Sequence, residues 1–402
     1  MKPFAKGLAA GLAIGVLLLL ILALYSFTSG TPEESGQTQD LDPLEAPAEI
    51  STPEESPRDT AEEPEELFLE PSEENSGNTM QEEELPEEPQ PSEVLFSFAG
   101  DVMFSDHYTS AYDQYGISAV ADDKMLSAMR DSDLFMLNEE FPFSLQGEAM
   151  EDKQYTFRTD PRYVSIFQDL GVDMVSVANN HALDFGMNAF CDTLDTLKQA
   201  EISCIGGGYN ITEASAPATC EVNGQTFAVF AATRVSPSYD WYATDSQPGM
   251  FQTYDPSMLN AAIAEADGQY DHVIVFVHWG IERNEYPEDY QRSLAKGYID
   301  AGADLVLGCH PHILQGFEYY KDVPIVYSLG NYLFGSREGD TLLLQAVFPD
   351  DGAMEIRLLP CRRQNGILSA IEDPSALYRR LTELSFGAEV SPEGILGRTA
   401  AD

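Results

Sequence analysis

Two histidines, His310 and His312, flank a proline in the stretch LGCHPHILQ. The chain has only 6 histidines, so a pair in one short stretch indicates a chemical role, although a polar turn after a strand would also explain it. Imidazole nitrogens bind divalent metals and exchange protons near neutral pH. The pair therefore predicts a metal site or a phosphate site, and the rest of the chain has to decide between these and a turn.

Several other apolar runs in the chain also end in a side chain that can bind a metal. Carboxylate, amide oxygen and neutral imidazole together suit divalent ions such as Mn, Fe or Zn. Two such ions about 3.5–4 Å apart could bind a phosphoryl oxygen and supply a hydroxide nucleophile. We therefore expect one or two divalent ions, with six candidate ligands: Asp101, Glu140, Asn180, His278, His310 and His312.

Each candidate also has a purely structural explanation. Asp101 could belong to a turn, Glu140 could be solvated, and Asn180 could cap the helix that follows. His278 could be a hydrogen-bonded core histidine. Together the candidates indicate a metal site more strongly than any one of them, because four of the 6 histidines (181, 278, 310 and 312) follow apolar runs.

The apolar runs predict the strands that must position these side chains. They are continuous rather than alternating, which is typical of strands buried on both faces of a sheet. Residues 220–233 and 341–358 indicate additional strands. The runs with a polar end lie at 94–101, 134–140, 172–181, 272–280, 303–312 and 324–331.

Helical segments alternate with these strands. Met187, Phe190, Leu194 and Leu197 are spaced to form one apolar stripe on a helix, and residues 288–302 predict a second helix that ends at a glycine. The alternation predicts an α/β fold. In open α/β sheets functional groups collect beyond the carboxyl ends of the strands, so the candidate ligands should meet there.

The N-terminus predicts a membrane anchor. Residues 8–24 are uninterrupted apolar or glycine residues and follow Lys2 and Lys6. No clear cleavage pattern follows, which favours an uncleaved anchor at residues 1–29 over a signal peptide. The two lysines keep the short N-terminus on the cytoplasmic side of the membrane. We therefore expect a single-pass cell-membrane protein with its main domain outside, as on a Gram-positive-like surface.

The next segment, residues 30–93, differs in composition from the rest. It holds 10 of the 24 prolines and 22 acidic residues against one base. Such a segment cannot bury enough apolar surface to fold, so we expect a disordered acidic linker. A folded domain at residues 94–360 and a less regular C-terminal extension at residues 361–402 should follow.

Residues 94–402 carry 46 acidic and 18 basic residues, a formal charge of about −28. This charge excludes a nucleic-acid partner, because phosphate contacts need clustered lysine and arginine. It also means that contact with an anionic polymer needs bound cations or a local basic pocket. The 5 cysteines form no C-x-x-C pair, which argues against a zinc knuckle or a disulfide framework and leaves one disulfide open.

An ordered series of motifs resembles that of the CapA family of poly-gamma-glutamate capsule biosynthesis proteins, also called PgsA. That family in turn resembles the calcineurin-like metallophosphoesterases, which implies a β-sandwich flanked by helices in four αββα layers. The motifs are AGDVM (99–103), NEEFP (138–142), SVANNHALDFG (176–186), VHWG (277–280), GCHPHILQ (308–315) and YSLGNYLFG (327–335).

The resemblance implies roles for the candidate residues. Asp101 matches the aspartate of the first motif, Glu140 stands where the bridging aspartate is expected, and Asn180 is an amide ligand. His181 would be the general acid or charge stabiliser beside a scissile phosphate. His278, His310 and His312 would be the remaining ligands. Met103 stands in place of the first-motif histidine, so one metal position is weakened or rebuilt and a single ion is an alternative to two.

Three further positions belong to the expected site. Asp184 either caps the following helix or orients His181. Arg158 either meets an anionic substrate group or makes a surface salt bridge. Asn331, at the end of a strand, is a candidate substrate contact.

The expected function is capsule or cell-envelope polymer biosynthesis or export, with a metal-dependent hydrolase of the phosphoesterase type. The substrate would be a phosphoester or an envelope polymer. The alternative is a non-catalytic accessory subunit of a membrane complex, in contact with polymer-synthesis subunits.

Overall fold

The computed structural model describes residues 93–335 and 338–399. The expected anchor at residues 1–29 and the expected linker at residues 30–93, apart from its last residue, lie outside the described residues. Among the helices that are described, none combines the length and the apolar character needed to cross a membrane.

The first of two large sheets has eight strands, and its centre is β1. From β1 to β4 the strands run parallel to one another, and β13 also runs parallel to β1. In order, the strands are β16 (Ile367–Ala370), β15 (Glu355–Gln364), β14 (Gly339–Phe348), β1 (Val94–Met103), β2 (Leu134–Glu139), β3 (Met174–Ser176) and β4 (Ser203–Ile205), with β13 (Asn331–Phe334) beside the end of β1.

The second large sheet has six strands with a parallel centre. Its order is β11 (Phe317–Tyr320), β12 (Val323–Val326), β10 (Leu305–Cys309), β9 (His272–His278), β7 (Gln225–Thr233) and β6 (Ala218–Val222). Two small ribbons complete the described strands: β5 (Gly207–Gly208) with β8 (Gly249–Met250), and β17 (Ala388–Val390) with β18 (Leu396–Arg398).

The side chains of β2 show why its apolar run is continuous. Leu134 and Met136 enter the core between the two sheets, whereas Phe135 and Leu137 enter a second core on the outer face of the sheet. Because successive side chains point to opposite faces, a strand covered on both faces needs apolar residues at every position. The prediction of strands buried on both faces is confirmed.

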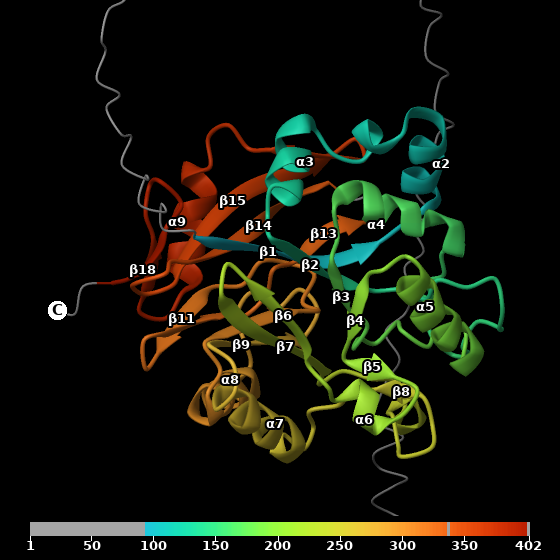
Figure 1. Ribbon diagram of the computed structural model, residues 1–402. Coiled ribbons are helices and arrows are strands. Elements are labelled where there is room, and N and C mark those ends of the chain that lie inside the picture. Colours follow the sequence, from blue (N-terminus) through green and yellow to red (C-terminus); the bar gives the residue numbers. More distant parts are fainter. Residues whose placement is uncertain (1–92, 336–337, 400–402) are drawn as a thin grey trace, which may run out of the picture. The chain divides into compact units, whose positions relative to one another are not determined.

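Helices cover the outer face of each sheet, so the layers are helices, sheet, sheet and helices. The core between the sheets includes Phe96 of β1 against Phe227 of β7, with ring centroids 4.4 Å apart. In Figure 1, α3 and α4 lie above the strands, and α7 and α8 lie below them. The predicted α/β fold is confirmed. The outer helices are α2 (Asp106–Tyr115), α3 (Asp123–Arg130), α4 (Val164–Leu170) and α5 (Met187–Gln199) on the eight-stranded sheet, and α7 (Ser257–Asp267) and α8 (Asp289–Ala301) on the six-stranded sheet.

The two predicted helices form as their sequences indicate. In α5, Phe190, Leu194 and Leu197 are buried on the stripe that faces the sheet. Helix α8 begins with a capping box made by Glu288 and Gln291, and it ends at Gly302 in the left-handed region. A short helix α6 (Ile211–Ala214) and three 3₁₀ turns, η1 (Ile117–Ala119), η2 (Pro161–Tyr163) and η3 (Tyr239–Trp241), lie in the connections.

The expectation of a less regular segment at residues 361–402 is wrong. Strand β15 continues to Gln364, and β16, α9 (Ser375–Leu384) and the β17–β18 ribbon follow. In α9, Tyr378, Leu381 and Leu384 are buried at a spacing of three residues, which is a helical stripe. Strands β16, β17 and β18 have only 4, 3 and 3 residues, too few to give a clear alternating pattern in the sequence.

Gly100 sits where β1 passes close to the turn at Gly330. A Cβ at Gly100 would lie 1.8 Å from the Gly330 oxygen, which also accepts a 2.9 Å hydrogen bond from the Asp101 amide. We expect Gly100→Ala to lower the free energy of unfolding by about 2–4 kcal/mol, because the backbone must move apart. Gly397→Ala is the control, since a Cβ there meets nothing within 4 Å. Urea unfolding of both variants checks this, and equal midpoints would contradict it.

Candidate metal centre

The carboxyl ends of β1 and β2 in one sheet, and of β9 and β10 in the other, bring their polar side chains to one buried group. Each of its candidate donor sets has ligand atoms within 4.8 Å of one another. The sets are Asp101, His278 and Cys309; Glu140, His278 and His310; and Asp101, Glu140 and His312.

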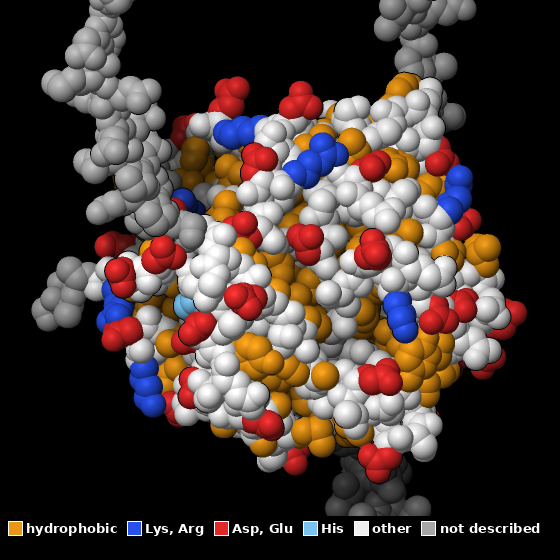
Figure 2. Space-filling view, viewed as in Figure 1, with side chains coloured by type: hydrophobic (Ala, Val, Ile, Leu, Met, Phe, Trp, Pro, Cys, Tyr) orange, Lys and Arg blue, Asp and Glu red, His pale blue; other side chains and the backbone are white. Residues whose placement is uncertain are grey.

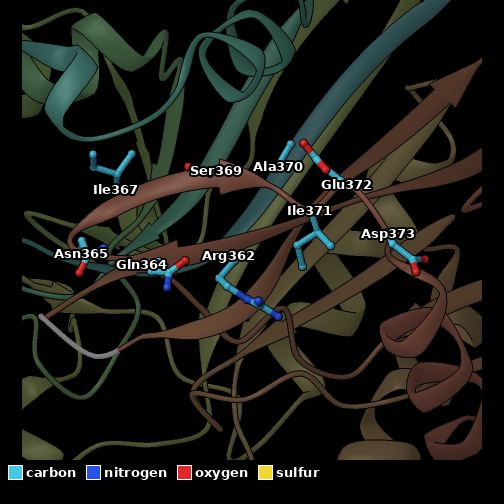
Figure 3. A pocket seen from close by; sticks show the side chains of 9 residues that line it. All are labelled: Arg362, Gln364, Asn365, Ile367, Ser369, Ala370, Ile371, Glu372 and Asp373. Atoms are coloured by element: carbon cyan, nitrogen blue, oxygen red, sulfur yellow. The ribbon is translucent and has the colours of Figure 1, made fainter.

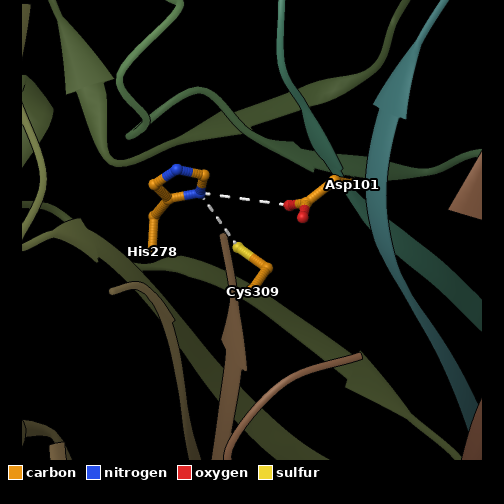
Figure 4. A group of neighbouring side chains, drawn as sticks. All are labelled: Asp101, His278 and Cys309. Carbon is orange, nitrogen blue, oxygen red and sulfur yellow. Dashed lines mark hydrogen bonds and ion pairs between the residues drawn. The ribbon is translucent and has the colours of Figure 1, made fainter. Parts of the chain in front are cut away.

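His278, the last residue of β9, lies at the centre of this group. Its Nδ1 is 4.0 Å from Asp101 Oδ1 and 3.2 Å from Cys309 Sγ. Figure 4 shows these three side chains pointing toward one another. The Nε2 atom is 2.6 Å from Asn180 Oδ1 and 3.8 Å from Glu140 Oε1. One ring therefore connects ligand candidates from four different segments.

The loop after β10 holds its two histidines in an unfavourable backbone conformation. His310 has φ 96° and His312 has φ 59°, values that cost energy for any residue except glycine. The His310 amide donates to Asp101 Oδ2 at 3.2 Å, and His312 Nδ1 lies 2.8 Å from Asn331 Oδ1 and 3.2 Å from Asp101 Oδ2. Such strain is typical of functional sites, where surrounding contacts maintain it.

A pair of buried amides fixes the carboxylates. Asn138 Nδ2 donates to Asp101 Oδ1 at 2.9 Å and to Glu140 Oε2 at 3.3 Å. Its Oδ1 accepts a hydrogen bond from Asn179 Nδ2 at 3.1 Å. Asn179 Oδ1 in turn accepts from the His181 amide at 3.0 Å. The network therefore extends from the carboxylates to the segment that carries His181.

His181 is held by Asp184 and Lys153. Its Nδ1 lies 2.6 Å from Asp184 Oδ2, and its ring stacks on Phe157 at 4.2 Å. Lys153 Nζ donates to Asp184 Oδ1 and lies 3.1 Å from His181 Nδ1. The N-cap of α5 is Gly186 rather than Asp184. Of the two explanations for Asp184, the structure matches the one in which it orients His181.

Burial is the largest influence on the pKa values of these groups. It raises the pKa of Glu140 well above its usual value, and the Asp101 charge adds to this. It lowers the pKa of His278 well below its usual value and that of His310 to about 3. Burial also lowers the pKa of His312, but Glu140 and Asp101 outweigh it and raise that pKa to about 10. His312 must release this proton before it can act as a ligand.

The residues of this group fit a divalent cation. Glu140 Oε1 and His310 Nδ1 are buried and have no hydrogen-bond partner within residues 93–335 and 338–399. Unpaired buried polar atoms are costly and rare. Carboxylate oxygen, imidazole nitrogen and thiol sulfur are the donors that Zn, Fe or Mn ions take. A cation bound here would give both atoms a partner.

Comparison with known proteins gives the family. Residues 95–336 match the family described as "Bacterial capsule synthesis protein PGA_cap". The chain belongs to this family. The resemblance found in the motifs is therefore confirmed.

The curated relatives include two CapA proteins. The chain is 32% identical over 269 residues to the PGA biosynthesis protein CapA of Bacillus subtilis (strain 168), which covers 66% of this chain and 70% of that protein. It is 31% identical over 304 residues to the capsule biosynthesis protein CapA of Bacillus anthracis, covering 72% and 73%. Among solved structures, a phosphatase from Mycoplasma pneumoniae has a TM-score of 0.42 at 12% identity, covering 68% of this chain and 94% of that one.

The remaining expected site residues of this PGA_cap family member have separate positions. Asn180 lies against His278, and Asn331 is hydrogen-bonded to His312. Arg158 is exposed; it donates to the Gln146 carbonyl at 3.2 Å, and its guanidinium lies 4.1 Å from the Phe185 ring centroid. Within the described part of the chain it contacts no candidate ligand, and its substrate role stays a prediction.

Met103 occupies the end of β1 and packs against the core under the outer helices. It belongs to none of the candidate donor sets found within the described part of the chain. The place where the resemblance expects a histidine ligand is therefore filled by an apolar contact.

Sequence reasoning missed three members of the site. Cys309 stood inside the LGCHPHILQ motif but was not among the six expected ligands. Burial, with Asp101 and Glu140, raises the pKa of its thiol. Asn138 stood in the NEEFP motif. Lys153 lies in a connection without helix or strand, where no pattern marks it.

A surface pocket lies at the edge of the eight-stranded sheet, away from these residues in the chain. Arg362, Gln364 and Glu372 are among the side chains that line it, from β15, β16 and the segment after β16 (Figure 3). None of its lining residues is a candidate ligand.

Proposed function

We propose that this protein acts in capsule or cell-envelope polymer synthesis or export as a metal-dependent phosphoesterase-type hydrolase. The main observation behind this proposal is the buried donor group, in which Glu140 Oε1 and His310 Nδ1 have no hydrogen-bond partner among the described residues. Membership of the capsule synthesis family supports the process. The donor group supports the reaction type.

The donor group would hold one or two divalent cations, of Mn, Fe or Zn type. Bound there, the cation would polarise a phosphoryl oxygen and lower the pKa of water. Cys309 is a further donor beside the six expected ones, which are Asp101, Glu140, Asn180, His278, His310 and His312.

His181, oriented by Asp184, would exchange a proton with the substrate. Because Asp184 is 2.6 Å from His181 Nδ1, the proton on that nitrogen is donated to the carboxylate, which leaves Nε2 to exchange a proton with substrate. Burial lowers the pKa of His181, and Asp184 opposes this by favouring the charged ring. Lys153 holds Asp184 in place.

The proposal includes the cell membrane as the site of action. Residues 8–24 would be the anchor, the domain from residue 94 would lie outside the cell, and polymer-synthesis subunits would be its partners. The apolar segment behind two lysines and the acidic linker support this arrangement.

A second candidate function is a non-catalytic accessory subunit of a polymer-synthesis complex. The apolar packing of Met103, where a histidine ligand is expected, favours it because an incomplete ligand set weakens catalysis. A relative from Mycobacterium tuberculosis (strain ATCC 25618 / H37Rv), 29% identical over 209 residues and covering 50% of this chain and 55% of that protein, is named "Probable polyglutamine synthesis accessory protein".

The test is the metal content of the full chain purified without chelator, followed by assays on a panel of phosphoesters. We expect bound metal, and hydrolysis that a chelator abolishes and added metal restores. Bound metal without hydrolysis of any substrate would favour the accessory function. Absence of bound metal at neutral pH would contradict both the metal site and the hydrolase.

A further inference from the structure

The backbone of Arg234 adjoins His278, a member of the candidate metal centre. It follows Thr233, the last residue of β7, which pairs in register with His278 at the end of β9. The Arg234 amide donates to the His278 carbonyl at 2.8 Å. Arg234 therefore emerges at the same carboxyl edge of the sheet as the candidate ligands, one strand away from His278.

The guanidinium of Arg234 is half-buried between two tyrosine rings. Its Cζ is 3.5 Å from the Tyr254 ring centroid and 5.2 Å from that of Tyr290. Within the described residues, its side chain makes no hydrogen bond or ion pair, whereas Arg292 is paired with Glu318 at 2.8 Å. Stacking occupies the faces of the guanidinium and leaves its N–H edge available to an oxyanion.

Tyr290 places this arginine next to the histidine loop. Its hydroxyl accepts a hydrogen bond from the Gly280 amide at 2.7 Å. A Cβ at Gly280 would lie 3.1 Å from Pro311 Cγ, between His310 and His312. The segment that supports one face of the guanidinium is thus in contact with the loop that carries two candidate ligands.

On the other side of Arg234 the rings continue as an aromatic shelf, which we define as Tyr239, Tyr242 and Tyr254. Their ring centroids are 5.9–6.5 Å apart. Tyr239 is 81% exposed and Tyr254 42% exposed. The shelf offers apolar surface and hydroxyl groups beside the Arg234 guanidinium, which lies over the Tyr254 ring.

We infer that Arg234 and the aromatic shelf form a subsite for a carboxylate-bearing γ-glutamyl chain. The guanidinium would hold one carboxylate by two parallel hydrogen bonds, and the methylene groups of the chain would lie on the tyrosine rings. This inference rests on the proposed function, from which it takes the polymer class. It adds the residues that would bring the polymer to the metal centre.

The charge of the domain favours such a subsite. Residues 94–402 carry about −28, which repels a polyanion. On the face shown in Figure 2, acidic side chains are widespread, and lysines and arginines stand apart from one another. A polymer carboxylate therefore needs bound cations or a local base, and Arg234 is a base that has no acidic partner among residues 93–335 and 338–399 and whose backbone adjoins His278.

The test is calorimetric titration of the full chain at about 0.15 M salt with a short γ-linked glutamate oligomer. The same oligomer with amidated carboxylates is the neutral probe, and inorganic phosphate is the other oxyanion. We expect the acidic oligomer to bind and Arg234→Gln to weaken it about 10- to 100-fold. Arg379→Gln, which removes an exposed arginine of α9, should change nothing.

Several results of this titration would overturn the inference. Equal affinity for the acidic and the amidated oligomers, an equal loss in Arg379→Gln, or unchanged affinity in Arg234→Gln overturns the inference. If phosphate displaces the oligomer and binds as tightly, the subsite is for phosphate and the carboxylate assignment is wrong. If Arg234→Gln has a lower melting temperature than the wild type, Arg234→Lys is measured in its place. Wild-type affinity of Arg234→Lys for the acidic oligomer would overturn the proposed pair of hydrogen bonds from the guanidinium to one carboxylate.

Metal content keeps this test apart from that of the proposed function. Arg234 is not a candidate ligand, so Arg234→Gln should retain the metal content of the wild type. Lost oligomer binding with retained metal supports the subsite. Retained oligomer binding with retained metal refutes the subsite and leaves the metal centre untouched.

Discussion

Replacing His310 and His312 together with alanine is expected to reduce bound metal to background and to lower any phosphoesterase activity at least about a hundredfold. Two of the three candidate donor sets lose a member in this variant. The remaining set is Asp101, His278 and Cys309. The variant also affects this set, because the His312 side chain contacts Asp101. Elemental analysis of the purified full chain, with circular dichroism to show that it is folded, checks the result.

His107→Ala is the matched control, because His107 is an exposed histidine of α2 and belongs to no donor set within the described residues. Unchanged metal content in the folded double variant would refute the assignment of the centre to this loop. A Cys309→Ser variant tests whether the ion is bound by Asp101, His278 and Cys309. Loss of metal in this variant would assign the ion to that set, because Cys309 belongs to neither of the other two sets.

Lys153→Met is expected to lower the free energy of unfolding by about 3 kcal/mol, because it leaves the buried Asp184 carboxylate without its ammonium partner. The Asp184 side chain is fully buried, and that of Lys153 is 15% exposed. Burial lowers the pKa of Lys153, whereas Asp184 favours its charged form, so the pair depends on both members. Adding Asp184→Asn should recover more than half of the loss, because both charges of this pair are then absent.

Chemical denaturation of the two single variants and the double variant measures this coupling. The control is Lys321→Met, which removes a salt bridge to Asp300 between side chains 61% and 49% exposed and should cost less than about 1 kcal/mol. If Lys153→Met costs no more than this control, Lys153 does not hold Asp184 and the orientation of His181 must have another source.

The strands and their ends could be predicted because one physical rule governs them. A strand covered on both faces, such as β2 or β9, must be apolar at every position, and its first polar residue marks the sheet edge. His278, the last residue of β9, was located by this rule alone, whereas Asp101 lies inside β1, which continues to Met103. The meeting of His312 with Asp101 does not follow from this rule, because β1 and β10 belong to different sheets. It depends on the packing of the two sheets, which only the family resemblance implied.

Other parts of the site follow no local rule. Lys153 reaches Asp184 from a connection without helix or strand, and its position depends on contacts formed only when the chain is folded. Arg234 follows the strand that was expected to end at residue 233. Its contacts with the rings of Tyr254 and Tyr290, however, involve three segments that are distant in the sequence. Tertiary packing of this kind leaves no periodic signal in the sequence.

The donor group takes its members from both sheets. Asp101 lies in β1 and Glu140 follows β2 of one sheet, and His278 ends β9 and His310 follows β10 of the other. Any cation held there would act as a cross-link between the two halves of the sandwich. Its binding energy would then oppose their separation, by about 2.7 kcal/mol when free metal is a hundredfold above its dissociation constant. Metal supply would thus help to decide how long the folded chain survives.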